Sequence, residues 1–164
     1  MIEAAGFTIR PIIDADRAWI QELTTVQWSA PIVVSRGRIY HPDQLPGFIA
    51  ECEGQPCGLL TNHIKDSDCE IVTLASLVEG IGIGSALIEA ARKFAVQAGC
   101  RRLWLITTND NLPALRFYQK RGFHLVAVHR DALEATRIIK PGLPRLGMDG
   151  IPLRDEIELE LLLS

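Results

Sequence analysis

The sequence has no run of five or more lysines and arginines, and no stretch that approaches the ~18 uncharged apolar residues of a membrane-spanning helix. The first absence argues against nucleic acid as a partner and the second against a membrane. The N-terminal residues MIEAAGFTIRPIIDAD lack the basic start and long apolar stretch of a signal peptide. We therefore expect a cytoplasmic protein that binds neither nucleic acid nor membranes.

Cysteine and histidine are also few, with 4 of each. Only Cys52 and Cys57 lie close together, and they do not form a CxxC pair. The histidines have neither HxxxH nor HExxH spacing. From this we expect reduced thiols rather than disulfides, and no metal site.

What remains is an ordinary globular composition. The 164 residues are 48% apolar with a formal net charge of −3, which suggests one domain over 1–164. Mild acidity is compatible with a cationic or amine partner. Monomer and homodimer both stay open.

Strand-like and helix-like patterns follow one another along the whole chain. We expect a strand at 7–13, a helix at 14–28 and an irregular segment at 29–46 that contains a short helix. An antiparallel meander at 47–53, 57–65 and 69–77 follows, then a helix at 83–98, a strand at 101–108, a helix at 111–123 and a strand at 123–130. The long segment 131–156 suggests one or two helical turns and a functional loop or lid. A half-buried strand at 157–163 ends the chain, with an exposed edge that can pair with another chain.

Three alternate glycines, Gly80, Gly82 and Gly84, open the helix at 83–98. With the strands on either side, this helix forms a βαβ unit whose two strands run parallel. Bare backbone amides at a helix N-terminus attract phosphate, and glycine permits a close approach. The glycines can equally serve only to make a sharp strand-to-helix turn, and the spacing alone leaves both interpretations open.

Neither common nucleotide motif fits this loop. Ser85 stands where a dinucleotide fingerprint needs glycine, and no acidic residue follows at the expected distance. A Walker A loop needs a lysine before the serine, and none is present.

The loop instead resembles the acyl-CoA loop of the GCN5-related N-acetyltransferase (GNAT) family. The family pattern Gln/Arg-x-x-Gly-x-Gly/Ala is matched over 79–84, with Glu79 where the family has Gln or Arg. A carboxylate there would repel pyrophosphate unless it points outward. A second family pattern, Asn-x-x-Ala-x-x-Phe-Tyr-x-x-x-Gly-Phe, is matched at Asn111, Ala114, Phe117, Tyr118, Gly122 and Phe123.

The resemblance covers nearly the whole chain and implies both fold and activity. The implied fold is α+β with three layers, in which a mixed, largely antiparallel sheet of about seven strands has one parallel βαβ unit and is flanked by helices. The implied activity is transfer of the acetyl group of acetyl-CoA to a primary amine of a small molecule or protein. No cysteine lies beside an obvious base, so direct attack by the amine is the simpler mechanism.

The resemblance also implies where the co-substrate binds. The thioester would lie in a notch where the strands 69–77 and 101–108 separate. The cofactor-binding residues would be Leu74, Ala75, Ser76, Gly80, Ile81, Gly82, Ile83, Gly84, Ser85 and Asn111. Asn111 is also a plausible plain helix cap.

Two catalytic residues follow from the same resemblance. Tyr118 would protonate the leaving sulfur, unless it is an ordinary core aromatic. Glu70 would act as the base, often through water, unless it is a surface glutamate of a hairpin. The segments 29–46 and 131–156 would shape the acceptor site. The alternative function is a non-catalytic acyl-CoA sensor or interaction module.

Overall fold

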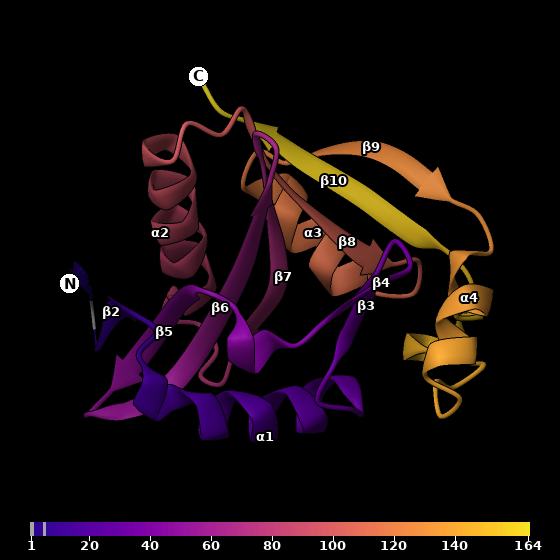
Figure 1. Ribbon diagram of the computed structural model, residues 1–164, viewed down its shortest axis with the longest axis horizontal. Coiled ribbons are helices and arrows are strands. Elements are labelled where there is room, and N and C mark those ends of the chain that lie inside the picture. The colour runs from indigo at the N-terminus through magenta and orange to yellow at the C-terminus, as the bar shows by residue number, and fades with distance from the viewer. Residues whose placement is uncertain (1, 5) are drawn as a thin grey trace.

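The structure of the chain is a computed structural model that describes residues 2–4 and 6–164. Its centre is one mixed sheet of eight strands in the order β1-β2-β5-β6-β7-β8-β10-β9 (Figure 1). The strands are β1 (Ile2–Ala4), β2 (Phe7–Pro11), β5 (Gly47–Cys52), β6 (Gln55–Lys65), β7 (Asp68–Ser76), β8 (Arg102–Thr108), β10 (Glu156–Leu162) and β9 (His124–His129).

Helices cover both faces of this sheet and give three layers. The helices are α1 (Arg17–Trp28), α2 (Ile83–Gln97), α3 (Leu112–Lys120) and α4 (Ala132–Ile139), with the 3₁₀ helices η1 (Asp14–Asp16), η2 (Pro42–Gln44) and η3 (Met148–Gly150). On one face α2 and α3 pack over the larger apolar core, and on the other α1 packs over a smaller one. In the described ranges every helix is too short or too polar to cross a bilayer. The cytoplasmic location stays a prediction.

The parallel pair β7 and β8 is the one departure from antiparallel pairing in this sheet. The helix α2 connects these two strands, as a parallel pair requires. The predicted meander is also present, because β5, β6 and β7 pair in sequence. The predicted fold class is thus confirmed.

The segment 29–46 is more ordered than predicted. It contains the hairpin of β3 (Val33–Ser35) and β4 (Arg38–Tyr40), and its predicted short helix is η2. Arg36 and Gly37 turn the hairpin with positive φ of 49° and 76°. Strands of three residues carry too little alternation to be recognised in a sequence. Because β3 packs against β7, the hairpin brings its side chains to the centre of the sheet.

Two predictions about this fold are wrong. The C-terminal strand β10 is not at an edge, because it pairs with β8 on one side and β9 on the other. The edge strand on this side of the sheet is β9, and its Leu125 and Val128 are exposed. Local pattern shows that a strand exists, but its neighbours are set by contacts far away in the chain.

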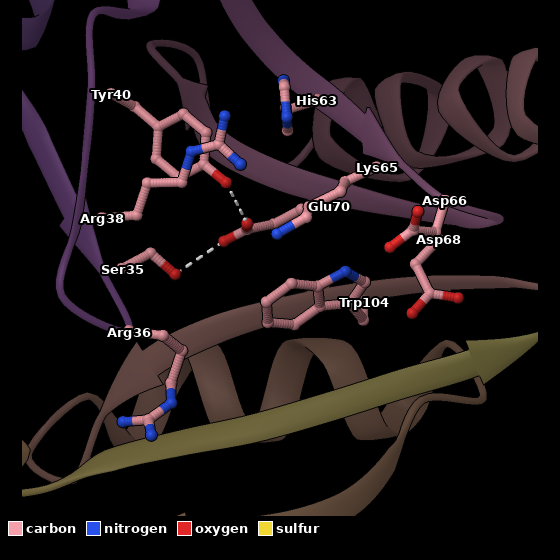
Figure 2. Close-up of a pocket in the computed structure, with 10 residues that line it drawn as sticks. All are labelled: Ser35, Arg36, Arg38, Tyr40, His63, Lys65, Asp66, Asp68, Glu70 and Trp104. Atoms are coloured by element: carbon pink, nitrogen blue, oxygen red, sulfur yellow. Dashed lines mark hydrogen bonds between the residues drawn. The ribbon is translucent and has the colours of Figure 1, made fainter.

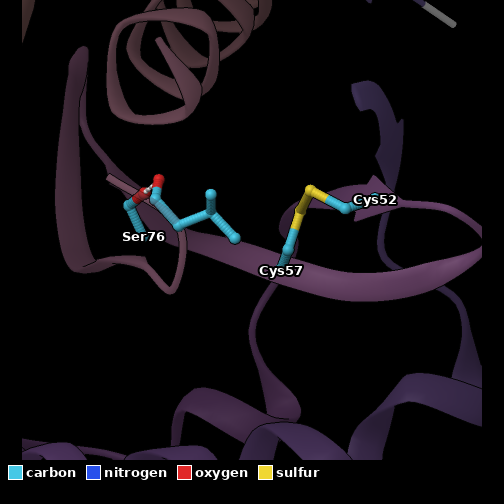
Figure 3. The surroundings of a disulfide bond; sticks show 4 residues. Cys52, Cys57 and Ser76 are labelled. Carbon is cyan, nitrogen blue, oxygen red and sulfur yellow. Dashed lines mark hydrogen bonds between the residues drawn. A yellow bond between two sulfur atoms is a disulfide. The ribbon is translucent and has the colours of Figure 1, made fainter. Parts of the chain in front are cut away.

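The second correction concerns the cysteines. Cys52 and Cys57 form a disulfide across the turn between β5 and β6 (Figure 3). Glu53 and Gly54 have positive φ, so the chain reverses within two residues and brings the two Cα atoms to 5.8 Å, a normal disulfide separation. The prediction of reduced thiols holds for the other two cysteines, which are free and buried.

Candidate active site

The strands β7 and β8 pair over only part of their length. Asp68–Ile71 pair with Arg102–Leu105, but β7 continues to Ser76 and β8 to Thr108. Among the described residues, β7 residues 73–76 pair with β6 alone. The two strands therefore separate in the middle of the sheet, and the β7 edge over Leu74–Ser76 offers backbone groups to an extended ligand.

The glycine loop begins where β7 ends, and it is open to solvent from residue 76 to residue 82. Gly80 and Gly82 have positive φ of 81° and 91°, and a Cβ on either would meet nothing within 4 Å. Gly84 differs, because a Cβ there would lie 2.9 Å from Cζ of Phe117. Two glycines thus give the loop its turn and its open surface, while the third lets α3 pack against α2.

The first turn of α2 presents backbone amides that no helical carbonyl can reach. The amide of Ala86 makes a helical bond with the carbonyl of Gly82 at 3.0 Å. The amides of residues 83–85 precede this bond and so have no acceptor within the helix. Together with the helix dipole they attract an anion. Glu79 is exposed in the same loop.

Arg121, a cationic side chain that neither sequence pattern includes, lies beside this loop. Arg121 donates from Nε to Ser85 Oγ at 2.8 Å and from Nη1 to the carbonyl of Phe117 at 2.8 Å. Its guanidinium lies 3.6 Å from the centre of the Phe117 ring. Over residues 2–4 and 6–164, no carboxylate pairs with it. The free side of the guanidinium therefore remains available to a phosphate.

Glu70 lies on β7 just before the separation, and it is only 3% exposed. Ser35 Oγ donates to one carboxylate oxygen at 2.6 Å and Tyr40 Oη to the other at 2.7 Å (Figure 2). Burial raises the pKa of Glu70, whereas the two hydroxyls and nearby Arg38 lower it. The alternative of a surface glutamate is therefore wrong. The hairpin β3–β4, which the sequence did not reveal, supplies both donors.

Two cavities meet at Glu70. The smaller, of about 340 Å³, lies beneath the hairpin, and its lining includes Arg38, His63, Lys65 and Trp104 (Figure 2). The larger, of about 490 Å³, lies where β7 and β8 separate. Ser35 and Glu70 line both.

The wall of the larger cavity is formed by segments that are distant in sequence. The end of α1, the strand β3, the start of α4 and residues 143–148 all contribute to its wall. The predicted functional role of 131–156 is consistent with this position. Asn111 also lines the cavity, and its side chain accepts a hydrogen bond from the Ala114 amide at 3.1 Å. The helix-cap role of Asn111 is confirmed, and its contact with a ligand stays a prediction.

Tyr118 lies on α3, and its side chain is buried in the core. Its ring makes edge contacts with Phe117 and Phe123 at centroid distances of 5.2 and 5.4 Å. Burial raises the pKa of its hydroxyl, which keeps the proton in place. Tyr118 is not among the side chains that line either cavity. The packing role is thus observed, and the acid role stays a prediction.

The described residues contain no cluster of three side chains suited to a metal ion.

Comparison with known proteins assigns the chain to a family. The model of the acetyltransferase (GNAT) family matches residues 15–123. The chain belongs to this family. As a GNAT member it is an acetyl-CoA-dependent acyltransferase.

Several known proteins are similar to this chain. The uncharacterized protein YdhI of Bacillus subtilis is 44% identical over 131 residues, which are 79% of this chain and 82% of YdhI. An IAA acetyltransferase from Bacillus cereus has the same fold, with a TM-score of 0.73, 22% identity, and coverage of 96% of this chain and 99% of that one. A GNAT acetyltransferase from Elizabethkingia anophelis, solved with acetyl-CoA bound, has a TM-score of 0.69 at 19% identity, with coverage of 96% and 99%.

Proposed function

We propose that this GNAT protein is an N-acetyltransferase that moves the acetyl group of acetyl-CoA to a primary amine of a small molecule or protein. The observation that carries the proposal is the position of Glu70. A buried carboxylate with two hydroxyl donors borders the cavity where β7 and β8 separate. An amine in that cavity would have a base beside it.

The whole chain, 1–164, would act as one acyl-CoA-binding unit. The β7 edge at Leu74–Ser76 would pair with the pantetheine arm, and the amides of residues 80–85 would hold the pyrophosphate. Arg121 would add the positive charge that Glu79 does not supply. Asn111 would reach the pantetheine from the cavity wall while it caps α3.

The chemistry would proceed by direct attack. Glu70 would take a proton from the ammonium, directly or through water, and the free amine would attack the thioester carbonyl. Tyr118 would protonate the departing sulfur. A covalent acyl-cysteine route is disfavoured, because Cys52 and Cys57 are joined and burial raises the pKa of both free thiols, that of Cys69 to about 11 and also that of Cys100. No metal is needed for these steps.

The test is amine-dependent release of free thiol from acetyl-CoA, measured with a panel of primary amines. For Tyr118→Phe we expect kcat to fall by about tenfold to a hundredfold, as for loss of a general acid. Its Kd for acetyl-CoA should stay close to that of the parent. Binding of acetyl-CoA without transfer to any amine, small or on a protein, would contradict the proposal and favour the non-catalytic acyl-CoA sensor.

A further inference from the structure

Three buried carboxylates line the larger cavity, and only one of them forms an ion pair. Glu156 is paired with Arg36 at 3.1 Å. Glu70 and Asp110 are 3% and 6% exposed, and neither forms an ion pair with any residue that the structure describes. A buried charge without an opposite charge is costly, and proteins normally pair it.

The partners of Asp110 are neutral. One oxygen accepts from the hydroxyl of Thr108, and the other accepts from the amide of Met148 at 2.9 Å. The Asp110 carboxylate fits only because residue 147 is glycine, since a Cβ on Gly147 would lie 2.1 Å from Oδ2 of Asp110. The carboxylate is thus held in a defined place, with acceptor capacity left over.

Among the described residues that line this cavity, Lys140 is the one cation, and its ammonium group is already hydrogen-bonded. Lys140 donates from Nζ to the carbonyl of Trp28, the last residue of α1, at 2.6 Å. Burial lowers the pKa of its ammonium group. Arg38 lies near Glu70 from the smaller cavity, so among the described residues Asp110 is the carboxylate of this lining that has no cation close to it.

The strand register shows how far apart Glu70 and Asp110 are. Glu70 lies opposite Trp104 in the parallel pair. Thr108, which holds Asp110, is four residues further along β8, or roughly 13 Å at the usual rise of a strand. Ile106 lies between these two points in the register, and Leu133 and Leu153 are further apolar residues of the lining. One small cation cannot satisfy both carboxylates.

We propose that the acceptor is an aliphatic amine that carries a second cationic group, and that Asp110 binds this second group. The inference rests on the proposed function, in which the reacting amine lies at Glu70. The second cation would pair with Asp110, and the connecting chain would lie along the apolar wall. Asp110 is then a specificity-determining residue, which selects diamines over monoamines and over amino acids.

The test compares three probes of equal chain length in the thiol-release assay: α,ω-diaminoalkanes, n-alkylamines and ω-amino acids, each from four to ten carbons. We expect kcat/KM for the best diamine to exceed that of the matching monoamine by about tenfold, the value of one charge-assisted hydrogen bond. The ω-amino acid should be the poorest. In Asp110→Asn the ratio of diamine to monoamine should fall close to one.

The matched control is Asp149→Asn, an exposed aspartate near Asp110's partner Met148, which should keep the parent ratio. Equal or better use of monoamines or ω-amino acids by the parent protein would overturn the inference, whether or not Asp110→Asn folds. Equal loss for all three probes in a folded Asp110→Asn would also overturn it. If acetyl-CoA binds and monoamines react without a preference for diamines, only this inference fails. If no amine reacts, the proposed function fails with it.

Discussion

A carboxylate as deeply buried as that of Glu70 keeps its charge only if donors replace the water it has lost. Ser35 and Tyr40 are those donors, one for each oxygen. Burial raises the pKa of Glu70 and the two hydroxyls oppose that rise. The result is a base whose proton affinity exceeds that of an exposed glutamate, as removal of a proton from an ammonium group requires.

Tyr40→Phe tests this balance at one residue. Loss of the hydroxyl removes a hydrogen bond to the ionised form, so the pKa of Glu70 should rise further. Because Glu70 acts when deprotonated, activity is lost as the pH falls through this pKa. The acid limb of kcat/KM against pH should therefore move to higher pH by about one unit. An acid limb that stays in place, or that moves to lower pH, would show that Glu70 is not the group that titrates.

The sequence located some of these residues and not others. Glu70 and Asn111 were predicted at the site, and the structure places both on the wall of one cavity. Ser35 and Arg121 were missed, and Tyr40 was expected only as part of the acceptor-site segment 29–46, because each acts through a partner more than 25 residues away. A sequence pattern records spacing along the chain, so it cannot reveal a donor that arrives from another element.

At the scale of elements, the position of the glycine loop depends on how closely α2 approaches the sheet. Gly58 on β6 faces Ile83, the first residue of α2, and a Cβ on Gly58 would lie 2.6 Å from its methyl carbon. The same Cβ would lie 3.1 Å from that of Ala50. The helix can begin where it does only because Gly58 has no side chain.

Gly58→Ala should therefore push the start of α2 away from the sheet. We expect the free energy of unfolding to fall by about 1–3 kcal/mol, as for other overpacked cores, and acetyl-CoA to bind more weakly. Urea denaturation measures the first effect and calorimetry the second. Gly142→Ala is the control, because a Cβ there meets nothing within 4 Å. Equal stability of the two variants would contradict the packing argument.

Helices and strands with a strong local sequence pattern were predicted, and those without one were missed. The helix at 83–98 was recognised from its helix-like pattern and the glycines that open it, and the structure has α2 at Ile83–Gln97. The hairpin β3–β4 had no such signal, since its strands are three residues long and pack through distant contacts. The disulfide was missed for a similar reason. Its spacing does not form a known motif, and only the turn at Glu53–Gly54 brings the two thiols together.

At the scale of the whole molecule, the position of the site is set by the order and pairing of the strands in the sheet. The parallel strands β7 and β8 pair only as far as Ile71 and Leu105, and segments far apart in the chain line the cavity where they separate. The order of elements could be predicted from sequence, and with it the fold class. The edge of the sheet could not, because the choice of β9 over β10 depends on pairing across the molecule.

The central claim is that acetyl-CoA binds with its pyrophosphate on the amides of residues 80–85 and beside Arg121. The most direct test is titration of the folded protein with acetyl-CoA by calorimetry, with Gly82→Glu and Arg121→Gln as variants. We expect micromolar binding that Gly82→Glu abolishes and that Arg121→Gln weakens by about tenfold, through loss of one charge-assisted contact. No binding by the folded parent protein, or unchanged binding in a folded Gly82→Glu, would contradict it.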